Sequence, residues 1–294
     1  MRILLTGAQG QLGQHLQPLL ANVGNLTCVD QAQCDLTDQR ATAQLLDDLK
    51  PQLIVNPAAM TAVDLAEDER ELADQLNHRL PAQLAAWCLV RDAQLIHYST
   101  DYVFGGKQTQ PWREDDPQTP QSVYGQTKQA GEKAIQATGV GGLILRTAWL
   151  YSALPGNFLT AILARASRGE DLSVVCDQVG SPTWAQSLAQ ETVQLITENH
   201  VPDHGMGVYH CVNRGAVSWY EFAKTAIEIA YEMGKIDRLV AVRAVSSDQW
   251  PQKALRPSGS VLDPGKLEKL TGRAVPTFKD ALVGCLSQWS AQTC

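Results

Sequence analysis

The feature that most constrains the fold is a glycine-rich turn placed directly after the first apolar segment of the chain. Residues 2–6 have the composition of a short buried strand, Gly7-Ala-Gln-Gly10-Gln-Leu-Gly13 follows at once, and leucines at helical spacing come next. Strand, glycine turn and helix in this order form the context of a dinucleotide-binding site, because the turn brings a helix N-terminus close to a pyrophosphate. The spacing is G-x-x-G-x-x-G, so a plain strand–helix turn packed through its glycines is the alternative.

Apolar strand-like segments recur through the first half of the chain and alternate with segments of helical period. The expected strands cover residues 2–6, 26–29, 51–56, 94–99 and 142–147, and the expected helices cover 38–49, 64–74, 76–90 and about 124–138. Strands that alternate with helices predict a parallel sheet with helices on both faces. We therefore predict an α/β fold with a Rossmann-like, doubly wound parallel sheet.

The alternation loosens after residue 150, where helical segments near 157–167 and 219–233 and a short strand at 172–175 are expected. Ser218 and Glu221 have the spacing of a capping box at the start of the second of these helices. We predict an NAD(P)-binding Rossmann-like domain over residues 1–150. Residues 151–294 are predicted to form a smaller substrate-binding lobe with segments that return to the sheet.

Charge and cysteine content restrict the class of protein. The net charge is -7 and the basic residues are scattered, so we expect no nucleic-acid partner. We also expect no membrane association, since no apolar stretch reaches 18 residues. The seven cysteines are spread along the chain without a Cys-x-x-Cys pair, which predicts free thiols in a reducing cytoplasm rather than a zinc site or a disulfide framework.

The candidate catalytic residues lie in the stretch Tyr124-Gly-Gln-Thr-Lys128 and at Thr100. On a helix, Tyr124 and Lys128 stand one turn apart on the same face, so the ammonium can lie beside the phenol and lower its pKa from the usual value of about 10. Thr100 closes a buried strand at its C-terminal end, which is where open α/β sheets bind ligands. A Tyr-x-x-x-Lys pair alone is a weak signal and gains weight only from these surroundings.

Two further segments have the position of cofactor contacts. Asp30 ends the second expected strand 17 residues after Gly13, where an acidic side chain accepts hydrogen bonds from the adenine ribose. Its charge disfavours a 2′-phosphate and favours NADH, but neighbouring arginines can reverse this preference, so NADPH and NADH both remain. The small-residue loop from Pro57 to Thr61 would let a flat cofactor pass, or is an ordinary strand–helix connection.

Several blocks in order along nearly the whole chain resemble the dTDP-4-dehydrorhamnose reductase family, within the extended short-chain dehydrogenase/reductase superfamily. The blocks are Leu4–Gly13, Ala59–Asp64, Ser99–Phe104, Pro111-Trp112 with Glu114 and Asp116, Val123–Lys133, Leu145–Trp149, Asn157-Phe158, Asp177-Gln178 with Gly180, Pro182-Thr183, Arg256-Pro257 and Leu262-Asp263. Pro57 stands where the family usually has a small residue, and Met60 stands where it commonly has tyrosine.

The resemblance implies reduction of the C4 keto group of dTDP-4-dehydro-L-rhamnose by hydride from NADPH or NADH. Tyr124 would donate the proton to the carbonyl oxygen, Lys128 would lower the pKa of Tyr124 and hold the nicotinamide ribose, and Thr100 would hydrogen-bond the developing alkoxide. Asp101, Tyr102 and Trp149 would line the deoxyhexose pocket. Arg256 would meet the diphosphate, because its fork suits phosphate oxygens.

The resemblance also implies a set of residues that line the cofactor cleft: Gly10, Gln11, Leu12, Asp30, Asp35, Leu36, Ala59, Met60, Thr61 and Tyr98. Some family members place magnesium at a dimer contact. The acidic run Glu114–Asp116 is more typical of a solvated loop or a cap, and the histidines lack ligand spacing, so we assign no metal. A homodimer is compatible with the family. Arg146 is expected to be a structural ion-pair partner.

Three alternatives use similar residues. Sugar-nucleotide 4,6-dehydratases resemble this chain but carry Thr-Asp-Glu where this chain has Thr100-Asp101-Tyr102, so the carboxylate base for elimination is missing. Nucleotide-sugar epimerases use the same Tyr–Lys pair and keep their cofactor bound, so the motifs do not exclude them. A non-catalytic NADP-binding regulatory subunit would tend to lose part of the Tyr–Lys–Thr set, which is complete here.

Overall fold

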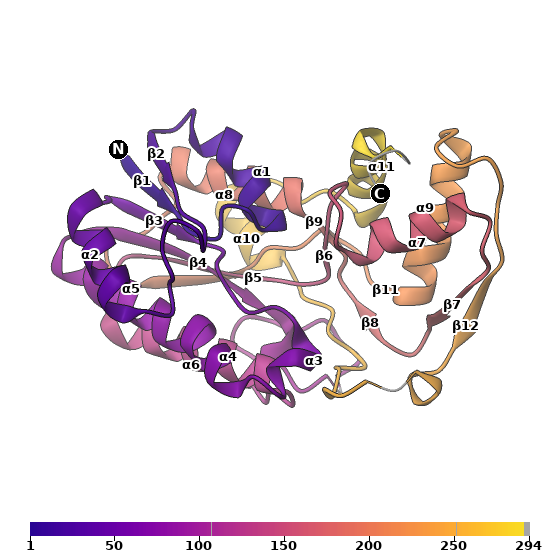
Figure 1. Cartoon of the computed structure of the whole chain (residues 1–294), viewed down its shortest axis with the longest axis horizontal. Helices are drawn as coiled ribbons and strands as arrows, with labels where there is room; N and C mark the ends of the chain where they lie inside the picture. The colour runs from indigo at the N-terminus through magenta and orange to yellow at the C-terminus, as the bar shows by residue number, and fades with distance from the viewer. Residues whose placement is uncertain (107, 251, 291–294) are drawn as a thin grey trace.

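Six parallel strands form the sheet of the computed structural model, which describes residues 1–106, 108–250 and 252–290 (Figure 1). The strands are β1 (Arg2–Leu5), β2 (Asn25–Cys28), β3 (Leu53–Asn56), β4 (Gln94–Thr100), β5 (Gly142–Thr147) and β10 (Met206–His210), in the order β10-β5-β4-β3-β1-β2. All neighbouring pairs are parallel. The chain leaves β1 towards β2 on one side and returns to β3 on the other, so the sheet has its switch point between β1 and β3. The predicted doubly wound sheet is confirmed.

The two faces of the sheet are buried by different helices, because successive strand residues point to opposite faces. Ile3 and Leu5 pack on one face and Leu4 packs on the other. The first face carries α1 (Gln11–Leu20), α8 (Ala185–Thr197) and α10 (Gly265–Thr271). The second face carries α2 (Gln39–Leu49), α5 (Leu80–Val90) and α6 (Val123–Thr138).

One long helical segment replaces the two helices expected over 64–74 and 76–90. The short helix α3 (Val63–Ala66) ends early, and α4 (Arg70–Asp74) then runs without a break through a π-helical turn, η1 (Gln75–Arg79), into α5. Within the turn, the Asn77 side chain donates to the Met60 carbonyl and accepts from the Met60 amide, both at 3.0 Å, and donates to Thr127 Oγ1 at 3.2 Å. The π turn therefore ties the loop after β3 to helix α6.

The second half of the chain contributes both to the sheet and to a smaller lobe, on the right in Figure 1. Strand β10 pairs with β5, and α8 and α10 cover the sheet. The lobe contains β6 (Leu150–Tyr151), α7 (Phe158–Ser167), β7 (Leu172–Val175), β8 (Val179–Gly180), β9 (Thr183–Trp184), β11 (Val217–Ser218), α9 (Trp219–Glu232), β12 (Val242–Val245) and α11 (Phe278–Gln288). Its core includes Tyr151, Phe222, Leu282 and Trp289.

Ser218 begins α9 with the capping box that the sequence predicts. The Ser218 hydroxyl accepts from the Glu221 amide at 3.1 Å, and Glu221 Oε2 accepts from the Ser218 amide at 2.7 Å. Two orphan N–H groups at the helix start are thereby satisfied.

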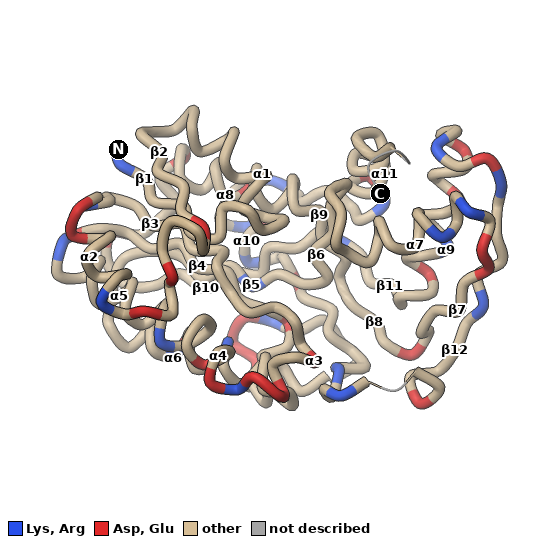
Figure 2. The backbone as a smooth tube through the Cα atoms, viewed as in Figure 1, with Lys and Arg blue, Asp and Glu red and all other residues tan. Residues whose placement is uncertain are grey.

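Basic and acidic residues are spread along the chain, and a run of acidic residues lies along α3 and α4 (Figure 2). Cys28, Cys34, Cys88, Cys176, Cys211 and Cys285 are free thiols, and Cys294 lies outside the described residues. Among the residues described, no helix combines the length and the apolar character that crossing a membrane requires.

Candidate active site

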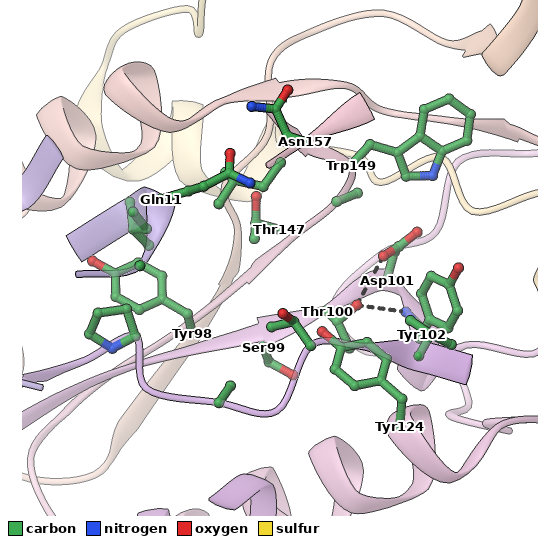
Figure 3. Close-up of a pocket in the computed structure, with 18 of the residues that line it drawn as sticks. Gln11, Tyr98, Ser99, Thr100, Asp101, Tyr102, Tyr124, Thr147, Trp149 and Asn157 are labelled. Carbon is green, nitrogen blue, oxygen red and sulfur yellow. Dashed lines mark hydrogen bonds between the residues drawn. The ribbon is translucent and has the colours of Figure 1, made fainter. Parts of the chain in front are cut away.

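A cavity of about 480 Å³ opens where the carboxyl ends of the sheet strands meet the smaller lobe. Its walls include most of the residues predicted to bind cofactor or substrate: Gly7, Gly10, Gln11, Leu12, Ala59, Thr61, Tyr98, Thr100, Asp101, Tyr102, Tyr124, Lys128 and Trp149. Figure 3 shows Gln11 and Tyr98 towards one end of the cavity and Trp149 and Asp101 towards the other. The cavity therefore extends from the glycine turn after β1 to Trp149, with Thr100 and Tyr124 also in its wall.

The glycine turn between β1 and α1 leaves its surface free of side chains. Gly7 has a φ of +53°, and a Cβ built there would lie 2.9 Å from Ala58 Cα. A Cβ on Gly13 would overlap the Gly7 carbonyl. Gly10 caps α1 without a side-chain hydrogen bond, so the first-turn N–H groups are open to a ligand in the cavity. The turn fits the pyrophosphate of a dinucleotide, whose charge the helix N-terminus stabilises.

Helix α6 presents a stripe of three polar side chains to the sheet, Tyr124, Lys128 and Glu132, at successive intervals of four residues. The helix begins at the Ser122 cap, whose hydroxyl accepts from the Gly125 amide at 3.2 Å. Tyr124 lines the cavity, and Glu132 holds the buried Arg146 through two hydrogen bonds of 2.9 and 2.8 Å. The expected structural ion pair of Arg146 is confirmed.

Lys128 Nζ makes its hydrogen bonds with atoms of β4, and the prediction that Lys128 lowers the pKa of the Tyr124 phenol is wrong for this structure. Lys128 Nζ donates to the Tyr98 carbonyl at 2.6 Å and lies 3.2 Å from His97 Nε2. Burial raises the pKa of the Tyr124 phenol, and a hydrogen bond with the Thr100 side chain offsets part of this rise. Tyr124 is therefore protonated at neutral pH, which suits a proton donor better than a base.

The pKa of Lys128 is itself strongly shifted. Burial lowers its pKa to about 8, and the negative charge of Glu132 acts in the opposite direction. His97 is neutral, because burial and the nearby Lys128 hold the pKa of its imidazole well below the usual value. A lysine that titrates near neutral pH next to a neutral histidine is typical of a functional site.

Thr100 and Asp101 end β4 and begin the short 3₁₀ segment η2 (Asp101–Val103). Thr100 Oγ1 donates to Asp101 Oδ1 at 3.0 Å and accepts from the Tyr102 amide at 3.2 Å. Asp101 Oδ2 is buried without a partner among the described residues, and burial raises the pKa of this carboxyl to about 6. A buried oxygen in a cavity wall gains a partner when a ligand supplies one.

Aromatic rings from the smaller lobe close the other end of the cavity. Trp149 has a φ of +46°, unusual for a bulky residue, and its ring stacks on Trp219 with centroids 3.6 Å apart. The Phe158 ring lies 4.6 Å from that of Trp219. The sequence predicts only Trp149 of this wall. Phe158 and Trp219 begin the separate helices α7 and α9, and nothing in the sequence places the two helix starts side by side.

Several other residues of the cavity wall were not among the predicted site residues. They are Gly13, Pro57, Val63, Ser99, Thr147, Ala148, Leu150, Gly156 and Asn157. Ser99 Oγ and Thr147 Oγ1 are buried hydroxyl oxygens with no hydrogen-bond partner among the described residues. Gly13 belongs to the glycine turn and Pro57 to the loop after β3, both of which the sequence already places near a cofactor. The ends of β4 and β5, where ligands bind in open sheets, pointed to Ser99 and Thr147.

Four predicted cofactor contacts lie outside the residues that line this cavity. Asp30 accepts from the Ala32 amide at 2.8 Å, and Asp35 accepts from the Thr37 amide at 2.9 Å, so both close local turns. Leu36 borders a separate hollow near Arg79. Met60 is buried against Ala66 and Val123. Their contacts with a cofactor remain predictions.

Arg256 also lies beside the cavity rather than in its wall. Its guanidinium donates to Asp64 Oδ2 at 2.8 Å and to the Tyr102 hydroxyl at 3.1 Å. It lines an adjacent hollow of about 400 Å³, which shares Phe158 and Trp219 with the main cavity. Arg256 is thus connected to the site through Tyr102 and through a neighbouring space.

The position that would carry a second carboxylate in a dehydratase carries Tyr102. Its ring meets that of Tyr124 edge to face with centroids 5.4 Å apart, and burial raises the pKa of its phenol. Glu114 and Asp116 accept backbone hydrogen bonds from His210 and Arg113. Across residues 1–106, 108–250 and 252–290, no cluster of three His, Cys, Asp or Glu side chains has the arrangement of a metal site.

Comparison with known proteins gives a consistent family. The model of the family described as RmlD substrate binding domain matches residues 1–291. The dTDP-4-dehydrorhamnose reductase of Salmonella typhimurium is 40% identical over 283 residues, which cover 95% of each chain. Crystal structures of dTDP-4-dehydrorhamnose reductases from Clostridium acetobutylicum and from Bacillus anthracis, the latter in complex with NADP, each match with a TM-score of 0.89. They are 35% and 32% identical, and each match covers 98% of this chain and 99% of the other.

Proposed function

The chain belongs to the RmlD substrate binding domain family, and we propose that it is a dTDP-4-dehydrorhamnose reductase, which uses NAD(P)H to reduce the C4 keto group of dTDP-4-dehydro-L-rhamnose to dTDP-L-rhamnose. The observation that carries the proposal is the meeting of Tyr124, Thr100 and Lys128 in one cavity, between a glycine turn and an aromatic wall. Reduction needs one proton donor and one hydride donor at the same carbonyl, and this cavity has room for both.

The glycine turn and the first turn of α1 would hold the cofactor pyrophosphate through Gly7, Gly10, Gln11 and Leu12. The open N–H groups and the absence of side chains at the turn support this fit. When bound, the reduced nicotinamide supplies the hydride. NADP in the Bacillus anthracis relative supports NADPH, and the Asp30 carboxylate near the end of β2 leaves NADH as an alternative.

Tyr124 gives its proton to the C4 oxygen in the proposed reaction. Its raised pKa keeps the phenol protonated until negative charge develops on the substrate oxygen. The Thr100 hydroxyl stabilises that oxygen by a hydrogen bond. Lys128 lines the cavity, where it would hold the nicotinamide ribose, and it orders the end of β4 through its hydrogen bond with the Tyr98 carbonyl.

The deoxysugar would occupy the space between Asp101, Tyr102 and Trp149, with its ring against the indole face. The unpartnered Asp101 Oδ2 supports a hydrogen bond to a sugar hydroxyl. The diphosphate would then extend towards Arg256 in the adjoining hollow. On this basis residues 1–150 would bind the cofactor and supply Asp101, Tyr102 and Trp149 to the sugar, and residues 151–294 would form a substrate-binding lobe, with segments that return to the sheet, that adds Phe158, Trp219 and Arg256. We further propose a cytoplasmic enzyme that forms a homodimer.

Oxidation of NADPH and NADH with enzymatically generated dTDP-4-dehydro-L-rhamnose tests the proposal, with the product followed by mass. Consumption of cofactor coupled to a gain of two hydrogens establishes the reductase, and the two rates give the cofactor preference. Tyr124→Phe is the control that removes the proton donor. Conversion without net cofactor consumption would identify an epimerase, and cofactor binding without conversion would identify a regulatory subunit.

A further inference from the structure

A row of polar side chains crosses the sheet at the level where the cavity begins. Thr6 directly follows β1, Asn56 ends β3, and His97 lies in β4 in register with Asn56. The Thr6 amide donates to the Val55 carbonyl at 3.1 Å, so Thr6 continues the ladder beside Asn56. Leu4, Ile54 and Leu95, two residues earlier on each strand, all pack on the face that α6 covers. By the strand period of two, Thr6, Asn56 and His97 point to that same face.

The row is continuous and ends at Lys128. Thr6 Oγ1 donates to Asn56 Oδ1 at 2.6 Å, Asn56 Nδ2 lies 3.0 Å from His97 Nδ1, and His97 Nε2 lies 3.2 Å from Lys128 Nζ. Thr6, Asn56 and His97 are 0% exposed and Lys128 is 2% exposed. Because Thr6 is closed off from solvent, the row cannot deliver protons to bulk water.

The chemistry of the row allows two directions of hydrogen bonding. In one direction the Asn56 amide donates to His97 Nδ1, which leaves the proton of a neutral imidazole on Nε2, facing a neutral Lys128 amine. In the opposite direction an ammonium donates to Nε2, the ring proton is on Nδ1, and the Asn56 amide is rotated so that its oxygen accepts. An ammonium fits only the second direction, because the first leaves a donor facing a donor, whereas a neutral amine has both a lone pair and N–H groups and fits either direction.

The charge state of Lys128 decides which of these hydrogen-bond directions the row can adopt. The ionisable groups that contact Lys128, act on its charge or line the same cavity are His97, Glu132, Tyr98, Asp101, Tyr102 and Tyr124. Glu132 is held by Arg146, and its charge favours the ammonium form of Lys128. Burial keeps the Tyr98 and Tyr124 side chains neutral at physiological pH.

We propose that Thr6, Asn56 and His97 form a positioning row that holds Lys128 Nζ at the cavity in both of its charge states and presents His97 Nε2 as an acceptor whenever Lys128 is an ammonium. His97 is the central member, since it alone contacts Lys128. The row does not conduct protons. It gives the buried Lys128 a hydrogen-bond partner in both of its charge states, so the side chain does not have to move when it titrates. Only the kinetic consequences of this inference rest on the proposed function.

NMR of the ligand-free protein tests the row directly. The Cε resonance of Lys128 in ¹³C-lysine-labelled protein, assigned by its absence in Lys128→Met, gives the midpoint of its titration. His97→Leu removes an acceptor for the ammonium and is expected to lower this midpoint by about one pH unit or more, since such a bond is worth roughly one to two pKa units. His97→Gln keeps an acceptor and is expected to restore most of the shift. Asn56→Asp fixes the ring proton on Nδ1 and is expected to raise the midpoint.

The histidine ring ¹⁵N shifts supply a second readout that does not depend on either substitution's effect on folding. In the native protein, the proton of His97 is expected on Nδ1 at every pH at which Lys128 is an ammonium. A ring proton on Nε2 while Lys128 is an ammonium would overturn the proposal, as would an unchanged Lys128 midpoint in folded His97→Leu and Asn56→Asp. If the reductase is active, the pH dependence of kcat/KM moves with the same midpoints; a loss of rate equal at every pH would show a merely structural role.

Discussion

The indole of Trp149 lies face to face with that of Trp219, with centroids 3.6 Å apart and planes 5° from parallel. The two residues are 70 positions apart and come from different elements, since Trp149 follows β5 and Trp219 begins α9. Because both rings line the cavity, the pair couples the end of the sheet to the smaller lobe at the place proposed for the sugar.

Trp219→Ala is expected to raise KM for the sugar nucleotide about two- to tenfold with a smaller effect on kcat, because an aromatic pair contributes about 0.5–1.5 kcal/mol beyond its burial. The circular-dichroism couplet of two stacked indoles should disappear at the same time. Trp219→Phe, which keeps a stack, and Trp87→Ala, remote from the cavity, are the matched controls. An unaltered KM in Trp219→Ala would contradict the proposed sugar wall.

Tyr124→Phe is expected to lower kcat by roughly 10²–10⁴-fold, the usual contribution of a positioned general acid. Cofactor affinity, measured by fluorescence titration, should stay within about twofold, since the ring and its packing remain. Tyr151→Phe is a matched control, because the Tyr151 hydroxyl is buried without a hydrogen-bond partner among the described residues and lies outside the cavity wall. Full turnover in Tyr124→Phe would remove the phenol from the proposed mechanism.

Arg256→Ala is expected to raise KM roughly tenfold and to change kcat far less, since the guanidinium would bind the diphosphate before and during reaction. Its pairing with Asp64 is partly exposed and should contribute little to folding. Lys253→Ala, which removes a nearby exposed cation paired with Asp68, controls for general charge. Equal KM values for the native enzyme and Arg256→Ala would leave Arg256 a structural residue that supports Tyr102.

Asp101 predicts a pH-dependent stability. Its pKa is about 6 in the folded protein and near 3.8 when unfolded, so the native state holds a proton that the unfolded state releases between these values. The stability from this group is complete below about pH 4 and is lost as pH rises through about 6, by about 3 kcal/mol for two pKa units. Thermal unfolding of the native protein and Asp101→Asn should therefore differ progressively across this interval, in favour of Asp101→Asn at higher pH. A difference in Tm that stays constant from pH 4 to pH 7 would show that Asp101 does not titrate there.

The sheet and the glycine turn could be predicted because each rests on local patterns. Apolar runs such as Leu53–Asn56 form strands wherever the flanking helices bury both faces, and Gly7 is needed wherever the backbone adopts a positive φ. The capping box of Ser218 is equally local. These features require no knowledge of distant residues.

The environment of Lys128 could not be predicted from helical spacing. The i, i+4 rule places Lys128 on the same stripe as Tyr124, and the structure agrees. The rule does not say which atoms of the sheet lie beneath the stripe, and there the Tyr98 carbonyl and His97 offer better partners than the phenol. The Trp149–Trp219 wall depends in the same way on how the second half of the chain folds back.

The π turn at Gln75–Arg79 has a consequence for how this helix tolerates change in length. A π turn contains one residue more than the regular helix around it, so the residues on its two sides differ in rotational phase. Ala73, before the turn, packs near Met60 and Val123, whereas Leu80 and Leu84, after it, pack against the sheet. Deleting a single residue here would restore a regular helix and turn Asn77 away from Met60. The loop after β3, which lines the cavity through Ala59 and Thr61, would then lose its hydrogen bonds with Asn77, although every residue of the cavity wall would remain. A relative whose sequence has a one-residue gap at this position should therefore have a pocket of different shape.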